Sequence, residues 1–265
     1  MISFNKRLID RANGIGSYLC VGIDISPELL GSDDLEDMIR HSKLVVDATR
    51  DLALAYKPNF AFFERWGPKG FSWLEDLVEY IGEGPILIAD AKRGDIGSTA
   101  SQYAESIFNY FGFDCATLSP YLGVDSIEPF INHKGKGVFI LCRTSNPSGA
   151  EFQSQKINNS SYLYESVAVW ANSLNKRDNV GLVVGATAPE ELSAVRNIVP
   201  DLPLLIPGVG AQGGNLEHSI RVGNSSGIGL INISRSISFA GDLSESAIRS
   251  SAESFVSRMN KAIHG

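Results

Sequence analysis

The segment from residue 90 to residue 99 places several charged side chains directly after an apolar stretch, and it reads Asp-Ala-Lys-Arg-Gly-Asp-Ile-Gly-Ser-Thr. The apolar stretch, Pro85–Asp90, is typical of a buried parallel strand. Side chains alternate along a strand, so Asp90 and Lys92 are expected to point to the same side. Charges at the mouth of a strand are costly unless they are paired or catalytic. The segment therefore indicates either a simple ion pair or, together with Asp95, a catalytic group.

Apolar stretches alternate with helix-like segments along the whole chain. The predicted strands are Leu19–Asp24, Tyr56–Phe62, Pro85–Asp90, Cys115–Ser119, Gly137–Cys142, Val180–Gly185, Pro203–Gly208 and Gly227–Ile233. The predicted helices are Leu35–Ala55, Ser72–Ile81, Thr99–Phe111, Val124–His133, Ser160–Asn175, Glu190–Val199, Gly214–Val222 and Ser244–Ala262. Eight strand–helix units predict an α/β fold with a parallel sheet that closes as a (β/α)8 TIM barrel. An open doubly wound sheet is the alternative.

Length, composition and charge narrow the class of protein. The chain has 265 residues, 43% of them apolar, which fits a single (β/α)8 domain over residues 1–265. The net charge of −7 comes without a dense Lys/Arg run, which argues against nucleic acid or a membrane surface as partner. No stretch has the pattern of a signal peptide or a membrane span.

The cysteines and histidines favour a cytoplasmic protein without a metal site. The three cysteines, Cys20, Cys115 and Cys142, are widely spaced and each lies in an apolar stretch. This spacing is typical of buried thiols in a reducing compartment rather than of a disulfide framework or a zinc motif. The four histidines are scattered and none is spaced as a metal ligand. We therefore expect no metal and a cytoplasmic location.

Polar residues follow the predicted strands one after another. In a (β/α)8 barrel the catalytic groups collect at the carboxyl ends of the strands. The residues found there are Asp24, Lys57, Asp90, Lys92, Ser145, Gln212 and Arg235. Each has an ordinary explanation by itself, such as a turn former or a solvated charge. Their occurrence at consecutive strand ends favours a shared ligand.

Two further segments fit a ligand site at the same end of the barrel. The glycine-rich stretch 207–214 follows one strand and Arg235 follows the next. Glycines let backbone N–H groups approach an anion, and arginine adds a permanent charge, so this pair predicts a phosphate site. The polar segment at about 143–161 follows the fifth predicted strand. A long loop on the catalytic face is expected to act as a lid.

These motifs together resemble the orotidine 5'-phosphate decarboxylase family, whose signature is Asp-x-Lys-x-x-Asp-Ile followed shortly by Thr. The match covers Asp90, Lys92, Asp95, Ile96 and Thr99. The resemblance implies a homodimeric (β/α)8 carboxy-lyase without cofactor. Its substrate is the nucleotide orotidine 5'-phosphate, which it converts to UMP and CO2 in the last step of de novo pyrimidine nucleotide synthesis. The strings Thr-Ser-Asn-Pro at 144–147 and Lys-Pro-Asn-Phe at 57–60 are similar to the longer bacterial subgroup.

The resemblance also implies roles for individual residues. The catalytic tetrad maps to Lys57, Asp90, Lys92 and Asp95. The implied substrate-binding residues are Asp24 for the ribose, Ser145 for the pyrimidine, Gln212 and Arg235 for the phosphate, and Thr99, which with Asp95 reaches into the site of the other subunit. One departure is Ser234, where many members carry glycine before the arginine.

Three other functions fit parts of the pattern. A Mg²⁺-dependent sugar-phosphate decarboxylase or aldolase of the same barrel superfamily shares an Asp-x-Lys-x-x-Asp core, but Ile96, Thr99 and the serine loop fit the nucleotide enzyme better. A Schiff-base aldolase needs a neutral amine at Lys92, which two adjacent acids disfavour. A non-catalytic protein that binds a phosphoribosyl ligand requires a broken tetrad, whereas all four members are present.

Overall fold

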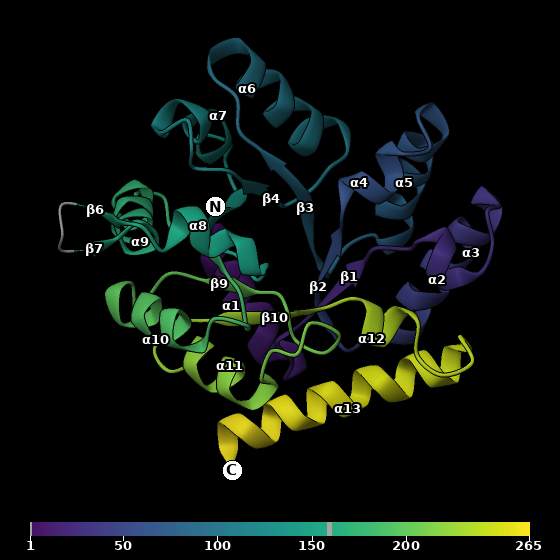
Figure 1. The fold of residues 1–265 in the computed structure, drawn as a ribbon. Coiled ribbons are helices and arrows are strands. Elements are labelled where there is room, and N and C mark those ends of the chain that lie inside the picture. Colours follow the sequence, from purple (N-terminus) through teal and green to yellow (C-terminus); the bar gives the residue numbers. More distant parts are fainter. Residues whose placement is uncertain (1, 158–160) are drawn as a thin grey trace.

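A closed parallel barrel forms the centre of the molecule, and helices surround it (Figure 1). The computed structural model describes residues 2–157 and 161–265. Around the barrel the strand order is β1-β10-β9-β8-β5-β4-β3-β2. The strands are β1 (Leu19–Ile23), β2 (Ala53–Pro58), β3 (Ile86–Arg93), β4 (Cys115–Leu118), β5 (Gly137–Arg143), β8 (Val180–Val184), β9 (Leu204–Ile206) and β10 (Gly229–Ile233). The predicted (β/α)8 barrel is confirmed.

Helices connect successive strands on the outside of the barrel. The longer ones are α3 (Leu35–Thr49), α5 (Pro68–Ile81), α6 (Gly97–Glu105), α9 (Leu163–Leu174), α10 (Pro189–Ile198), α11 (Leu216–Gly223) and α13 (Glu245–His264). A π-helical turn at Ser106–Tyr110 extends α6, and 3-10 turns lie at Val124–Ser126 and Pro147–Gly149. The short helices are α2 (Pro27–Leu30), α4 (Phe60–Glu64), α7 (Glu128–Ile131), α8 (Ala150–Gln153) and α12 (Arg235–Ser238). The larger apolar core lies between this helical layer and the strands.

Helix α1 (Phe4–Ile15) packs against the amino end of the barrel, and the sequence did not lead us to expect it. Phe4, Leu8 and Ala12 on one face of α1 join the apolar cluster inside the barrel. The ring of Phe4 meets the ring of Phe139 edge to face, with 6.2 Å between the centroids. Helix α1 therefore covers the amino end of the barrel, opposite the carboxyl ends of the strands.

The boundary between α3 and β2 differs from the prediction. The sequence predicts a helix over Leu35–Ala55, but α3 ends at Thr49 and β2 begins at Ala53. All six residues of β2 are buried between its two neighbouring strands, so sheet pairing overrides the helix preference of alanine and leucine. The strand also ends earlier than predicted, because the side chain of Asn59 accepts a hydrogen bond from the N–H of Ala61 and starts α4.

Candidate functional site

Two adjoining cavities open at the carboxyl ends of the barrel strands. The first has a volume of about 210 Å³, and the predicted residues that line it are Asp24, Lys57, Asp90, Ser145, Gln212 and Arg235. The second has a volume of about 340 Å³, and the predicted residues that line it are Lys57, Asp90, Lys92 and Ser145. Because Lys57, Asp90 and Ser145 line both, the cavities form one cleft.

Asp90 lies between two lysines where the two cavities meet. Its Oδ2 is 2.5 Å from Nζ of Lys57, and its Oδ1 is 2.5 Å from Nζ of Lys92. Lys57 and Asp90 are buried, whereas half of the Lys92 side chain is exposed. One carboxylate between two ammonium groups leaves the cluster with a positive charge. The cluster therefore suits an anionic ligand, which Lys92 can meet directly.

The ionisation of this cluster follows from its internal pairing. Burial by itself raises the pKa of the Asp90 carboxyl, but Lys57 and Lys92 together lower that pKa well below its usual value. Burial likewise lowers the pKa of Lys57, yet the charges of Asp90 and Asp24 bring it above its usual value. Asp90 is therefore ionised and Lys57 protonated at neutral pH.

Lys92 reaches Asp90 through an irregular stretch of β3. The strand continues past its predicted end at Asp90 to Arg93, and the pairing register with β4 shifts between Ala89 and Arg93. Lys92 has a φ of 45°, in the left-handed region that few residues other than glycine adopt. The side chains of Asp90 and Lys92 meet on one side of the strand, as predicted. The irregular backbone brings them together, and not the regular alternation of side chains along a strand.

Thr117 on β4 supports both of these residues, and we did not predict it. Its Oγ1 accepts a hydrogen bond from the N–H of Lys92 at 3.0 Å and donates one to Oδ1 of Asp90 at 3.2 Å. The residue is buried and lines the second cavity together with Asp90 and Lys92. A hydroxyl in an otherwise apolar strand is the sequence signal that could have identified it.

The end of the cleft that holds Arg235 presents groups suited to an anion. Arg235 is exposed and has no ion-pair partner among the residues that the structure describes. Gly208, with a φ of 98°, begins the turn that leads to Gln212. Asn232 and Ser236 line the same cavity and were not predicted. This arrangement can bind a phosphate through a guanidinium, an amide and a glycine-rich turn.

Two polar atoms near this end of the cleft have no hydrogen-bond partner within the described protein. They are Oδ1 of Asp24 and Oγ of Ser234, and both residues line the first cavity. Buried polar atoms are usually satisfied, so each calls for a partner that a ligand or water supplies. The Asp24 carboxylate can accept a hydrogen bond from a hydroxyl group of a ligand. This fits the sugar contact that the family resemblance implies for Asp24.

Ser145 extends over the cleft on the segment that follows β5. Its carbonyl oxygen accepts a hydrogen bond from Oγ1 of Thr187 at 2.8 Å. The segment lies so close to β8 that a Cβ added at Gly185 would be 2.7 Å from Cα of Ser145. Glycine at this position therefore lets Ser145 approach the cleft.

The predicted lid at 143–161 has regular structure in its described part. It contains the 3-10 turn, α8, and the paired strands β6 (Lys156–Ile157) and β7 (Ser161–Tyr162). The side chain of Gln153 on α8 exchanges hydrogen bonds with Thr144, next to Ser145. Residues 158–160 of the predicted lid lie outside the described residues.

Asp95 and Thr99 are the two predicted residues that line neither cavity. Asp95 lies between β3 and α6, and its Oδ1 accepts a hydrogen bond from the N–H of Ile96 at 2.8 Å. Thr99 is exposed in the first turn of α6. The structure therefore does not bring them into the cleft of their own chain.

Two kinds of feature are absent from the part of the chain that the structure describes. No group of three or more His, Cys, Asp or Glu side chains there is arranged to hold a metal ion. None of the described helices has both the length and the apolar character needed to cross a membrane.

The closed barrel, the lysine–aspartate–lysine cluster and the adjoining anion pocket together define a barrel enzyme that acts on a small anionic substrate. The model of the "Orotidine 5'-phosphate decarboxylase / HUMPS family" matches residues 17–249. The chain therefore belongs to this family, as its sequence motifs indicated.

Individual relatives agree with the family match. The orotidine 5'-phosphate decarboxylase of Natronomonas pharaonis is 47% identical over 245 residues, which are 91% of this chain and 90% of the relative. That of Roseiflexus castenholzii is 46% identical over 256 residues, 93% of each chain. Among solved structures, OMP decarboxylase from Leishmania donovani superposes with a TM-score of 0.89 at 37% identity and full coverage of both chains.

Proposed function

We propose that this chain decarboxylates orotidine 5'-phosphate to UMP and CO2, the last step of de novo pyrimidine nucleotide synthesis. The observation that carries this proposal is the ionised Lys57–Asp90–Lys92 cluster, which faces a cleft that continues to Arg235. Relatives that share 42–47% of their residues with the chain bear the name of this enzyme. Absorbance at the pyrimidine band tests the proposal directly: purified protein should consume orotidine 5'-phosphate and form UMP.

The reaction needs a positive group beside the carbon that loses CO2. When the bond from C6 to the carboxylate breaks, its electron pair stays on C6. Lys92 in the ammonium form stabilises this charge, and its Nζ then donates the proton that replaces CO2. Asp90 holds the Nζ group of Lys92 in position through their ion pair, and Asp95 of a second subunit completes the tetrad. The lysine regains its proton from water. A Schiff-base aldolase needs a free amine as nucleophile, whereas Lys92 forms an ion pair with Asp90.

Predicted residues around the cleft bind the substrate. Asp24 and Lys57 face the ribose, Ser145 meets the pyrimidine, and Gln212 with Arg235 binds the phosphate. Their positions around one cleft support this assignment. The predicted lid at about 143–161 closes over the cleft once the phosphate is bound. The binding energy of the phosphate, which is remote from C6, then helps to stabilise the transition state.

The phosphate assignment predicts a selective defect in binding-site variants. Arg235→Ala is expected to lower kcat/KM for orotidine 5'-phosphate about a hundredfold, because a charge-assisted pair with the phosphate is lost. Gln212→Ala should lower it about tenfold, because it removes a neutral donor. Decarboxylation of phosphate-free orotidine should change little in either variant. Equal losses with both substrates would show that these residues do not bind phosphate.

Thr117 provides a second prediction. Thr117→Val keeps the shape of the side chain but removes both hydrogen bonds to the cluster. We expect kcat to fall about ten- to a hundredfold, the range that corresponds to a hydrogen bond to a charged group. Thr117→Ser keeps the hydroxyl and is the matched control, with kcat close to that of the wild type. Unchanged turnover in the valine variant would mean that Thr117 only fills space.

We further propose that the enzyme needs no metal or other cofactor. Lys92 supplies both the positive charge and the proton that the reaction requires, so EDTA is expected to change kcat less than about twofold. A Mg²⁺-dependent sugar-phosphate decarboxylase or aldolase behaves in the opposite way. Full loss of activity in EDTA that added Mg²⁺ restores would favour that alternative.

A homodimer with shared active sites is the proposed assembly. Asp95 and Thr99 lie outside the cleft of their own chain, where they are available to a second copy. Exposed apolar side chains follow β3 and β4 at the same end of the barrel: Ile96, Tyr121, Leu122 and Val124. Apolar residues on a surface favour an interface. Around a twofold axis, these loops of one subunit would contact the same loops of the other subunit.

We propose the cytoplasm as the location of the protein. Its three buried cysteines are free thiols, which supports this proposal.

A further inference from the structure

The helix α12 carries Arg235 at its start, and its position depends on neighbouring elements. It has only four residues, so it contributes few hydrogen bonds of its own. The carbonyl groups at its end have no partners within the helix. Oγ of Ser251 on α13 donates to the carbonyl oxygen of Ser236 at 2.7 Å. The carbonyl oxygen of Ser238 lies one turn after Arg235, and its partner comes from α3 and not from α13.

His41 on α3 holds that second carbonyl. Its Nε2 lies 2.6 Å from the carbonyl oxygen of Ser238, and its ring stacks on Phe239 with 5.5 Å between the centroids. A carbonyl oxygen only accepts, so Nε2 carries the hydrogen. Burial lowers the pKa of His41, which keeps the ring neutral near pH 7. Oγ of Ser238 donates in turn to the carbonyl oxygen of Gly22 on β1, which links His41 to the barrel through α12.

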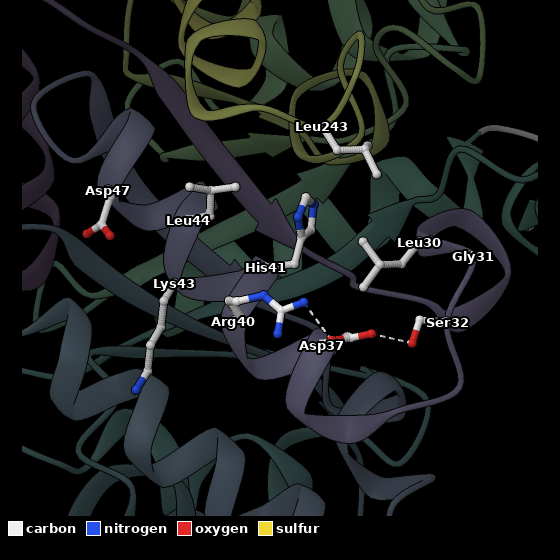
Figure 2. A pocket seen from close by; sticks show the side chains of 10 residues that line it. All are labelled: Leu30, Gly31, Ser32, Asp37, Arg40, His41, Lys43, Leu44, Asp47 and Leu243. Carbon is white, nitrogen blue, oxygen red and sulfur yellow. Dashed lines mark hydrogen bonds and ion pairs between the residues drawn. The ribbon is translucent and has the colours of Figure 1, made fainter.

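The hydrogen bond to the carbonyl oxygen of Ser238 is the main polar interaction of the His41 side chain. The side chain lines a surface pocket of about 610 Å³ and points from α3 toward the segment that carries Leu243 (Figure 2). The nearby charges are engaged with each other: Arg40 donates to Asp37 at 2.6 Å, and Ser32 donates to the same carboxylate at 2.5 Å (Figure 2). His41 itself is only 6% exposed. Its hydrogen bond is therefore directed at α12 rather than at solvent.

We propose that His41 is a positioning residue for phosphate recognition. By fixing the carbonyl group of Ser238, it sets the position of α12 and hence where Arg235 presents its guanidinium to the cleft. The inference rests on the proposed function, because it takes the substrate phosphate as the ligand of Arg235. His41 touches neither cavity of the cleft, so its effect on the reaction is indirect.

The test compares variants at position 41 with two substrates. His41→Leu removes the donor, and kcat/KM for orotidine 5'-phosphate is expected to fall about tenfold. With phosphate-free orotidine, kcat/KM should stay within about twofold of the wild type. His41→Gln places an amide N–H near the position of Nε2 and should recover most of the loss. His41→Asn reaches only the position of Nδ1 and should not.

His133→Leu is the matched control. The ring of His133 also packs on a phenylalanine, Phe108, but it lies before β5 at the opposite end of the barrel. This variant should leave kcat/KM for both substrates unchanged. Equal losses with both substrates in His41→Leu would assign His41 a structural role only, and wild-type kinetics would overturn the proposal. If the leucine variant does not fold, kcat/KM of His41→Gln and His41→Asn is compared instead. Equal values of kcat/KM for orotidine 5'-phosphate in these two variants would overturn the proposal.

The activity of the wild type distinguishes a failure of the proposed function from a failure of the role proposed for His41. If the wild type fails to consume orotidine 5'-phosphate, the proposed function is wrong. The role of His41 is then judged by calorimetric titration with inorganic phosphate. We expect weaker binding in His41→Leu and the weakest binding in Arg235→Ala. Phosphate affinity equal to that of the wild type in His41→Leu would overturn the inference.

Discussion

Lys92→Ala is expected to lower kcat about 10⁴-fold or more, because it removes both the charge beside C6 and the proton donor. The variant should still fold, since the Lys92 side chain is half exposed and Asp90 keeps its ion pair with Lys57. Affinity for the product UMP should change far less than turnover, because the phosphate end of the cleft is untouched. Single-turnover absorbance measurements give the rate, and calorimetry with UMP gives the affinity.

Lys92→Arg is the control for charge alone. It keeps a positive group near Asp90, but a guanidinium does not give up its proton at neutral pH. We therefore expect a loss almost as large as with alanine. A rate within about tenfold of the wild type in the alanine variant would remove Lys92 from the chemical step.

The second large effect is the recovery of activity from two inactive proteins. Lys92→Ala and Asp95→Ala are each expected to be nearly inactive, but subunit exchange between them should form heterodimers. In each heterodimer one site lacks both groups and the other site has both. Random exchange makes half of the dimers mixed, so the mixture should reach about a quarter of the wild-type activity.

A mixture of Lys92→Ala with Asp90→Ala controls for unspecific recovery. Both of these residues line the cleft of their own chain, so every site in that heterodimer lacks one of them. No activity should return. If verified exchange between the Lys92→Ala and Asp95→Ala proteins also restores nothing, Asp95 serves its own chain and the shared-site proposal is wrong.

The barrel could be predicted from the sequence because its strands are short apolar stretches at regular intervals. The errors lie where local preference and long-range pairing disagree. Residues 53–55 have the composition of a helix but belong to β2, where neighbours on both sides bury them. Helix α1 was missed because its apolar face is narrow, and only the open end of a completed barrel gives it a surface to pack on.

The site residues at strand ends were found because topology alone brings such positions together. Asp24, Lys57 and Arg235 are far apart in sequence and line one cavity. Thr117 was missed because its role depends on two hydrogen bonds to neighbours on another strand. The left-handed conformation of Lys92 was missed for a similar reason, since it depends on a register shift between β3 and β4.

The left-handed conformation of Lys92 lowers the stability of the fold, whereas its side chain is needed for catalysis. A lysine with a φ of 45° costs roughly 1–2 kcal/mol, whereas a glycine adopts the same backbone almost freely. Selection for thermal resistance alone would therefore favour glycine at position 92 and eliminate the ammonium group. A lineage that keeps lysine there accepts a less stable fold. Efforts to make the protein more heat-resistant should accordingly hold this position fixed and seek their gains elsewhere.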